Sequence, residues 1–260
     1  MSECDLHLLI TSEELSYCII LGKQVVALRS YLSSGSEFLS QSSQVEGILN
    51  RDDMLSRRYK SVRIAIEDPS HKLVPDEFFE AEELATLYHY GSSNFNKELY
   101  FDQVETLNHY NIFSVDRSLR NLLELQFRSP KFVSAFSCLL STLLKENNRN
   151  IENRLLINVH NNRLQIFAMK QDKLDSHSGY EFKTGEDFLY YLLHSVEKAK
   201  LKPSNTIAII SGNLERKSSH YQLASSYLPK IYFGSRPDTY DYREELGIFP
   251  YHFHYQLYSI

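Results

Sequence analysis

The first thirty residues alternate between apolar and polar stretches. Residues 6–10 and 15–21 are mostly apolar, and the polar residues 11–14 lie between them. A second polar turn at residues 22–24 is followed by another apolar stretch at residues 25–31. Short apolar stretches bounded by turn residues are typical of β-strands. The opening of the chain therefore predicts a meander of three strands.

A helix and a fourth strand are predicted after the meander. Ser43 can cap a helix whose apolar residues, Val45, Ile48 and Leu49, recur at helical spacing. Residues 61–66 then alternate between the two sides of a strand. The order of the predicted elements up to this point is βββαβ.

The next part of the chain predicts two helices on either side of a strand pair. Pro75, which two acidic residues follow, favours a helix start, and this helix is expected to continue up to Gly91. Residues 99–104 and 111–115 have the composition of strands. Asp116 can cap a second helix that ends near residue 127.

The second half of the chain repeats the plan of the first half. Ser129-Pro130 interrupts the pattern, and residues 131–145 predict a strongly apolar, buried helix. Residues 155–169 then repeat the apolar, polar, apolar order of the opening. The elements predicted after them are a strand at 175–182, a helix at 186–200 capped by Thr184, a strand at 207–210, a helix at 218–227 and a strand at 231–233.

This repetition predicts an α/β fold with mixed sheets, divided into two lobes. We expect the first lobe to span residues 1–128 and the second to span residues 129–236. Residues 237–260 are rich in aromatic and turn residues. An ordered tail packed on the lobes is expected there, because these aromatic side chains would otherwise expose a large apolar surface.

Composition and charge narrow the class of protein. The net charge of −5 and the sequence pI of about 6.1 argue against binding to nucleic acid. Three widely spaced cysteines do not make a disulfide framework, which favours a reducing cytoplasm. No stretch reaches the roughly 18 apolar residues that a membrane span needs, and no signal peptide opens the chain.

A duplicated βββα unit with a polar turn between its first two strands resembles the actin-like ATPases in element order and length. More closely, the chain resembles a bacterial family of unknown function, whose fold is similar to actin-like ATPases and to the cytoplasmic actin-like proteins of type IV pilus assembly. The resemblance covers nearly the whole chain. It implies two RNase-H-like βββαβαβ lobes, and it implies ATP with magnesium as the ligand that this fold usually holds.

The resemblance also implies three places for nucleotide contacts: the first turn of each lobe and the loop after the strand at 207–210. The residues at these places are Ser12 and Glu13, His160, Asn161 and Asn162, and Gly212 and Asn213. The chain departs from the phosphate motifs of the superfamily at both turns. The first turn has carboxylates but no glycine, the second turn has neither, and the late loop keeps one glycine. Solvated turns and a helix-entry loop are the alternative interpretations.

Other candidate chemistry is sparse. His252 and His254 form an H-x-H pair, but a metal site needs a third ligand that the sequence does not supply, so we predict packing roles and no metal. The sequence contains no nucleophile elbow, and Cys18 and Cys138 lie in apolar stretches that favour buried, inert thiols. No catalytic residue is therefore predicted.

These observations favour a non-catalytic protein of actin-like fold, a pseudo-ATPase that acts through contacts with an unknown protein partner and needs no cofactor. The alternative is an ATP-binding protein or slow ATPase, with magnesium and ATP in the cleft between the lobes. A third class, an RNase-H-like nuclease, needs several carboxylates at one sheet end. Only Asp5 and Glu13 lie near the first strand.

Overall fold

The computed structural model describes residues 1–32, 40–89, 97–146, 153–170, 173–243 and 250–260. These residues form two compact units. Unit 1 comprises Met1–Thr142, Asp238–Glu245 and Gln256–Ile260, and unit 2 comprises Leu143–Pro237 and Leu246–Tyr255. Each unit has its own sheet and its own hydrophobic core.

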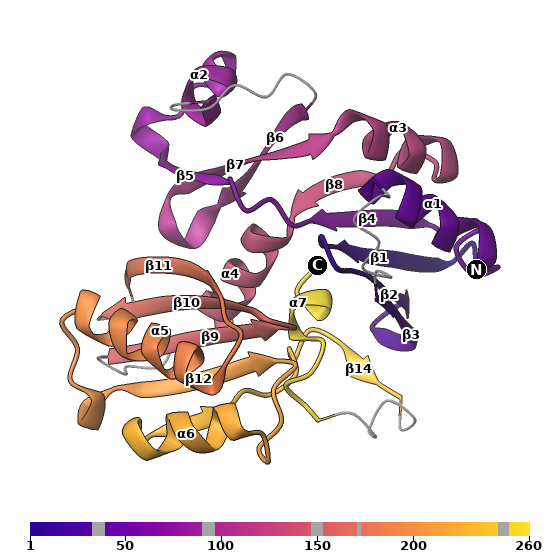
Figure 1. Cartoon of the computed structure of the whole chain (residues 1–260). Helices are drawn as coiled ribbons and strands as arrows, with labels where there is room; N and C mark the ends of the chain where they lie inside the picture. Colours follow the sequence, from indigo (N-terminus) through magenta and orange to yellow (C-terminus); the bar gives the residue numbers. More distant parts are fainter. Residues whose placement is uncertain (33–39, 90–96, 147–152, 171–172, 244–249) are drawn as a thin grey trace. The chain divides into compact units, whose positions relative to one another are not determined.

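The sheet of unit 1 begins with the predicted meander (Figure 1). Its strands are β1 (Cys4–Ile10), β2 (Glu14–Leu21), β3 (Gln24–Leu32), β4 (Ser61–Ile66), β8 (Lys131–Ser134) and β14 (Asp241–Tyr242). The strand order is β14-β3-β2-β1-β4-β8. Strand β1 pairs antiparallel to β2 and parallel to β4, and β8 continues the sheet parallel to β4.

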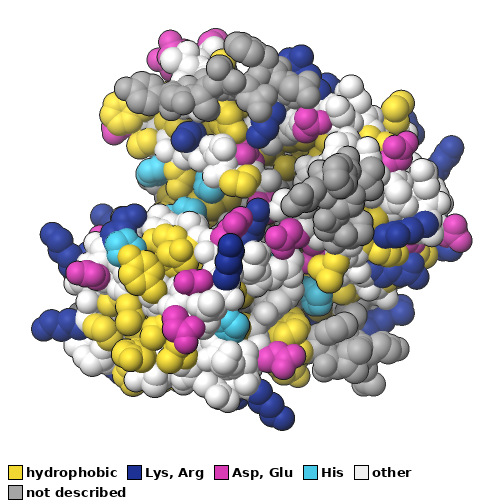
Figure 2. All heavy atoms as spheres, in the orientation of Figure 1, with side chains coloured by type: hydrophobic (Ala, Val, Ile, Leu, Met, Phe, Trp, Pro, Cys, Tyr) yellow, Lys and Arg dark blue, Asp and Glu magenta, His cyan; other side chains and the backbone are white. Residues whose placement is uncertain are grey.

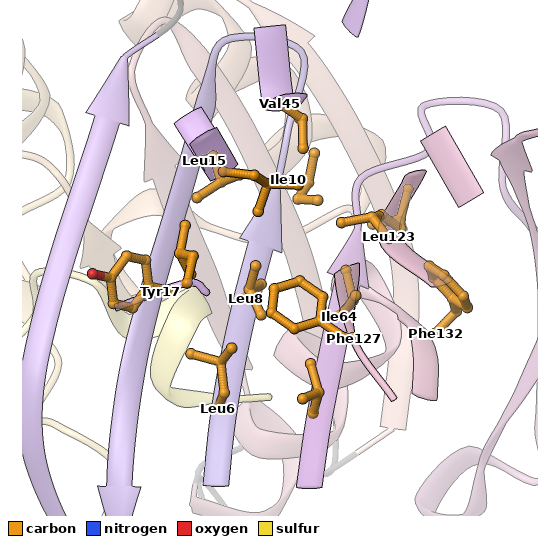
Figure 3. Packing of buried hydrophobic residues seen from close by; sticks show 14 of the residues in the cluster. Leu6, Leu8, Ile10, Leu15, Tyr17, Val45, Ile64, Leu123, Phe127 and Phe132 are labelled. Carbon is orange, nitrogen blue, oxygen red and sulfur yellow. The ribbon is translucent and has the colours of Figure 1, made fainter. Parts of the chain in front are cut away.

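Two helices cover one face of this sheet, α1 (Gln41–Arg51) and α3 (Arg117–Gln126). Because side chains alternate along a strand, Leu6, Leu8 and Ile10 of β1 point into the same core, as Figure 3 shows. Asp116 caps α3 through the N–H groups of Ser118 and Leu119, as predicted. The predicted cap of α1 was wrong by three residues. Ser40 is the cap, and its hydroxyl accepts a hydrogen bond from the N–H of Ser43.

A small three-stranded sheet is inserted between β4 and α3. It contains β5 (Lys72–Pro75), β6 (Lys97–Val104) and β7 (His109–Asp116) in the order β5-β7-β6, together with α2 (Leu84–His89) and the 3-10 turns Asp76–Phe78, Ala81–Glu83 and Glu105–Leu107. The predicted helix from Pro75 was wrong, because Phe79 and Glu80 are extended. The α-helix therefore begins only at Leu84.

The predicted helix at residues 131–145 was also wrong at its start. Residues 131–134 form β8, and α4 (Ala135–Glu146) begins after them. Apolar spacing alone does not separate a buried strand from a buried helix in so short a stretch. Pairing with β4 decides the conformation here, since Ile64 faces Phe132 and Ala65 faces Val133.

Unit 2 has the elements that the sequence predicts, in the predicted order. They are β9 (Asn153–His160), β10 (Arg163–Lys170), β11 (Lys173–Glu181), α5 (Gly185–Lys198), β12 (Ile207–Gly212), α6 (Ser219–Tyr227) and β13 (Ile231–Phe233). A 3-10 turn at Pro203–Asn205, which was not predicted, lies between α5 and β12. Thr184 caps α5 in a reciprocal capping box with Asp187. The strand order is β11-β10-β9-β12-β13.

The two sheets repeat each other in detail. Apart from β14, the order β3-β2-β1-β4-β8 of unit 1 corresponds strand by strand to the order of unit 2. Both meanders also carry a bulge in the third strand, one at Val26 in β3 and one at Asp175 in β11, and each is the third residue of its strand. The predicted duplication of a βββαβαβ unit is therefore confirmed, with the small sheet as an insertion in the first copy.

The last part of the chain is divided between the two units. Residues 238–245 and 256–260 belong to unit 1, where Asp241 pairs with Gln24, and residues 246–255 belong to unit 2. The last helix is α7 (Tyr255–Tyr258). The first segment of unit 1 extends to Thr142, beyond residue 128, where the first lobe was expected to end, and it includes β8 of the first sheet. Among the described helices, none is long and apolar enough to cross a membrane.

Candidate functional site

The turn between β1 and β2 holds Ser12 and Glu13 and satisfies its own backbone. The hydroxyl oxygen of Thr11 accepts hydrogen bonds from the N–H groups of Glu13, at 3.2 Å, and Glu14, at 3.0 Å. Thr11 N–H in turn donates to the carbonyl of Glu14 at 2.9 Å. Ser12 is exposed and Glu13 is half-buried. The N–H groups of Thr11, Glu13 and Glu14, which a phosphate could otherwise accept from, are thus already occupied in this turn.

The second carboxylate of this turn points inward. Glu14 is buried, and its carboxylate accepts a hydrogen bond from the hydroxyl of Ser16, which also contacts the hydroxyl of Ser30 at 2.8 Å. A cavity of about 20 Å³ lies beside the turn, lined in part by Ser12 and Gln41. A cavity of this volume accommodates about one water molecule and not a nucleotide.

The turn between β9 and β10 holds His160, Asn161 and Asn162 in unit 2. Asn161 adopts a left-handed conformation with φ of 53°, which asparagine tolerates better than most residues. The carbonyl of Asn162 accepts a hydrogen bond from the N–H of Phe182 at 2.8 Å. The side-chain oxygen of Asn162 is buried without a partner among the described residues. This oxygen is an acceptor, so it cannot bind a phosphate oxygen of a nucleotide.

Gly212 and Asn213 lie where β12 ends, and glycine is required there by the backbone. Gly212 has φ of +89°, and a Cβ atom at this position would lie 2.0 Å from the carbonyl oxygen of Val159. The N–H of Gly212 donates to the carbonyl of His252 at 2.7 Å. The N–H of Asn213 donates to the carbonyl of Val159 at 2.7 Å, and the N–H of Leu214 donates to Gly212 at 3.0 Å.

The segment around His252 covers this end of β12. His252 is buried, and its Nε2 atom lies 2.7 Å from the carbonyl oxygen of Leu214, to which it donates. The imidazole stacks on Phe233 with ring centroids 4.0 Å apart. Burial lowers the pKa of His252, although the Leu214 carbonyl opposes this effect. The neutral ring therefore serves packing, in agreement with the role that the sequence favours.

The structure brings together five of the seven predicted residues. Because β9 and β12 are parallel and Gly212 faces Val159, the β9–β10 turn and the loop after β12 lie at the same end of the sheet in unit 2. Ser12 and Glu13 lie at the corresponding end of the sheet in unit 1, after β1. Within the described parts of the chain, no three side chains of the metal-binding types gather into a site.

Asp68, which the sequence analysis missed, lies at the end of the unit 1 sheet where β4 ends. It follows β4, as Asn213 follows β12, and it is buried. One carboxylate oxygen accepts hydrogen bonds from the N–H of Ser114, at 2.8 Å, and from the hydroxyl of Tyr88, at 2.8 Å. The Ser114 hydroxyl donates to the same oxygen at 2.9 Å, and the N–H of Ser70 donates to the other. Two acidic residues, Glu67 and Asp68, between an apolar strand and Pro69 were the available signal.

Comparisons with known proteins place the fold and leave the activity open. Residues 1–231 match the family described as "Protein of unknown function (DUF3822)". No curated protein sequence matches the chain.

Two of the solved structures to which this chain is similar match it over at least 90% of its length. One is a Bacteroides thetaiotaomicron protein with an actin-like ATPase fold and unknown function. Its TM-score is 0.80 at 19% identity, over 90% of this chain and 91% of that chain. The other belongs to a PilM–PilN type IV pilus biogenesis complex, with a TM-score of 0.61 at 11% identity, over 98% of this chain and 96% of that chain. The fold is therefore that of the actin-like ATPases.

Proposed function

The chain belongs to the DUF3822 family of proteins of unknown function, and we propose that it is a non-catalytic member of the actin-like fold, a pseudo-ATPase that acts through contacts with another protein. One observation carries the proposal most directly. The three consecutive N–H groups at the end of β12, those of Gly212, Asn213 and Leu214, all donate to carbonyl groups of the chain itself. A fold does not by itself imply an activity, because the activity depends on the site.

The requirements of nucleotide binding give this observation its weight. A triphosphate needs several backbone N–H groups directed at its oxygens, together with a metal ion held by carboxylates. The Thr11 hydroxyl occupies two N–H groups of the first turn, and Glu14 is engaged with Ser16. The turn that holds Asn161 has neither a carboxylate nor a glycine. Each element that could hold phosphate is thus occupied or lacks the necessary groups.

Two further observations support the remaining parts of the proposal. A structure similar to this chain was determined in a complex of PilM with PilN, which supports a protein partner for a chain of this fold. Cys4, Cys18 and Cys138 are free and buried, which fits action in a reducing cytoplasm. Burial raises the pKa of both Cys18 and Cys138 to about 12, so neither thiol is a ready nucleophile.

A thermal-shift measurement with magnesium and ATP tests the proposal. A ligand at 100 times its dissociation constant adds about 2.7 kcal/mol of stability. For a protein of this size, each kcal/mol raises the melting temperature by roughly 2–4 °C. We expect no shift at millimolar ATP relative to magnesium sulfate alone, and no phosphate release above that of buffer.

The opposite result has a definite meaning. A rise in melting temperature of about 5–10 °C at millimolar ATP corresponds to a dissociation constant of roughly ten micromolar. That outcome would replace the proposal with its alternative, an ATP-binding protein or slow ATPase. Phosphate release measured on the same sample separates binding from hydrolysis.

A further inference from the structure

Aromatic side chains gather on one face of the small sheet β5-β7-β6. Phe79, which follows the first 3-10 turn, stacks on Tyr110 of β7 with centroids 3.9 Å apart and an angle of 16° between the rings. Phe101 of β6 lies 5.0 Å from Phe79 and 5.8 Å from Tyr110. Phe78, which precedes Phe79 in the chain, does not belong to the hydrophobic core of this sheet. Three rings from three separate elements thus form one continuous cluster.

The chain covers this cluster only partly, since Phe101 is 43% exposed. Phe78, which precedes Phe79 in the chain and is 64% exposed, adds apolar surface of its own. The core beneath them is small, with Val74, Tyr88 and Ile112 as its buried members. A single exposed phenylalanine is ordinary, but adjoining exposed aromatic surface marks an interaction site more often than it marks idle surface.

The part of the chain that forms this small sheet is strongly acidic. Residues 72–116 contain two lysines and nine carboxylates, a net charge of −7, whereas the whole chain carries −5. Five of these carboxylates are exposed within eight residues that also include Phe78 and Phe79: Asp76, Glu77, Glu80, Glu82 and Glu83. None of the five makes an ion pair within the described residues. Figure 2 shows acidic and hydrophobic side chains next to one another over this sheet.

We propose that this surface, formed by residues 76–83 with Phe101 and Tyr110, binds a basic segment of a partner protein that carries apolar side chains between its arginines or lysines. The apolar side chains cover the exposed phenylalanines, and the cations pair with carboxylates that make no ion pair in the part of the chain that the structure describes. Arginine also stacks on aromatic rings, which adds a second favourable contact. This inference rests on the proposed function, since it names the chemistry of the protein contact.

The negative charge of this surface favours a basic protein segment over nucleic acid, an anionic lipid surface or a second copy of the chain. Nucleic acid and anionic lipid surfaces are both negative, so the carboxylates repel them. A second copy of the chain brings its own net charge of −5. A basic partner is attracted from a distance as well as on contact, and its association rate therefore falls as salt is added.

Fluorescence anisotropy with the full-length chain tests the proposal. The probe is a labelled twelve-residue peptide of alternating arginine and leucine pairs, and the matched probe has glutamate in place of each arginine. We expect the arginine peptide to bind and the glutamate peptide not to bind. Phe78→Ser should weaken binding of the arginine peptide at least tenfold, as should Phe101→Ser. The double change Glu77→Gln and Glu80→Gln should weaken binding and also reduce its dependence on salt.

A control variant separates this surface from general attraction to an acidic protein. Leu125 is 88% exposed on α3, outside the aromatic cluster, so Leu125→Ser should leave the affinity unchanged. Melting temperatures of all variants establish that each is folded, and Phe78→Ser is the decisive one because its side chain is largely exposed.

Two outcomes overturn the proposal. One is equal affinity of the arginine peptide for the parent chain and for folded Phe78→Ser. The other is self-association of the parent chain, measured by sedimentation, that Phe78→Ser abolishes, because the occupant is then a second copy. Either outcome is independent of ATP binding, so failure here is distinguishable from failure of the pseudo-ATPase proposal.

Discussion

Asp52 shows how single residues hold the first meander to its helix. It follows α1 and is buried, and its two carboxylate oxygens accept four hydrogen bonds. The hydroxyls of Tyr17 and Tyr31 donate at 2.6 and 2.7 Å, the guanidinium of Arg29 at 2.9 Å, and the N–H of Met54 at 3.0 Å. Burial alone would raise the pKa of Asp52. The hydrogen bonds from both tyrosines and from Met54, together with the Arg29 charge, lower it overall.

Asp52→Asn tests this arrangement. The substitution replaces one acceptor oxygen with an N–H₂ group, so donors face donors in a buried place. We expect the free energy of unfolding to fall by roughly 1–3 kcal/mol, measured by urea denaturation at pH 7. Asp53→Asn is the matched control, because Asp53 is exposed, and it should change the stability by less than about 0.5 kcal/mol. Equal effects of the two substitutions would contradict the role given to Asp52.

His7 is a buried histidine in the middle of β1, and it makes the stability of the fold depend on pH. Burial lowers its pKa from about 6.5 to about 4; Arg63 adds to this effect and Asp5 opposes it. Between these values the unfolded chain takes up a proton that the folded chain does not. His7 therefore reduces stability progressively as the pH falls from about 6.5 to about 4.

His7→Leu should make the loss of stability on acidification shallower. Urea denaturation at several pH values between 7 and 4 measures the slope for the parent chain and the variant. Some slope remains in the variant, because burial also lowers the pKa values of His71 and His252. His194→Leu, at an exposed position on α5, is the control and should keep the slope of the parent chain. An unchanged slope in His7→Leu would refute the assignment.

At the scale of elements, the packing of β12 against β9 depends on Gly212. Gly212→Ala forces a Cβ atom to within 2.0 Å of the Val159 carbonyl oxygen and to 2.9 Å of its carbonyl carbon, while φ stays positive. Since both are backbone atoms, the strands themselves must shift. We expect a loss of at least about 3 kcal/mol in the free energy of unfolding.

Gly22→Ala separates the cost of a positive φ from the cost of the close approach to Val159. Gly22 also has positive φ, at +62°, but no atom lies within 4 Å of its Cβ position. The substitution should cost only the conformational penalty, roughly 1–2 kcal/mol. If both substitutions cost the same in urea denaturation, the close approach to Val159 has no energetic importance.

Most elements could be predicted because their signals are local. The apolar stretches of the two meanders, the Asp116 cap and the Thr184 cap each depend on residues close in sequence. The predictions failed where distant residues decide. Residues 131–134 become a strand by pairing with β4, and Phe79 stays extended where it stacks on Tyr110. Helical spacing cannot reveal either contact.

In the candidate site too, features that depend on neighbouring residues could be predicted, and features that depend on distant residues could not. Position after a strand was enough to place Gly212 and Asn161 in sharp turns. The sequence could not reveal that the carbonyl of His252, forty residues later, accepts a hydrogen bond from the N–H of Gly212. Nor could it reveal that Asp68 accepts hydrogen bonds from Tyr88 and Ser114, which lie 20 and 46 residues later in the chain.

At the scale of the whole molecule, duplication explains why the architecture could be predicted without a sharp motif. Two copies of one apolar pattern give the same strand order and the same bulge in the third strand. The tail has no counterpart in this repeat. Its division between the units depends on which surface each short segment covers, and an aromatic composition alone does not specify that.

The tail is part of the cores rather than an appendage, and Leu257 tests this. Leu257 is 1% exposed in a segment that belongs to unit 1, with Tyr258 and Ile260 equally buried beside it. Tyr258 also meets Tyr242, the residue of β14, with centroids 4.9 Å apart. Removing the buried methyl groups of Leu257 leaves a cavity as well as losing their transfer free energy.

We therefore expect Leu257→Ala to lower the free energy of unfolding by about 2–5 kcal/mol in urea denaturation. Leu125→Ala removes the same atoms from a side chain that is 88% exposed and should cost less than about 0.5 kcal/mol. The parent chain should also resist proteolytic removal of its last residues under native conditions, and Leu257→Ala should lose them faster. Rapid loss of the same residues from the parent chain, with the rest of it intact, would mean that the tail is not part of the core.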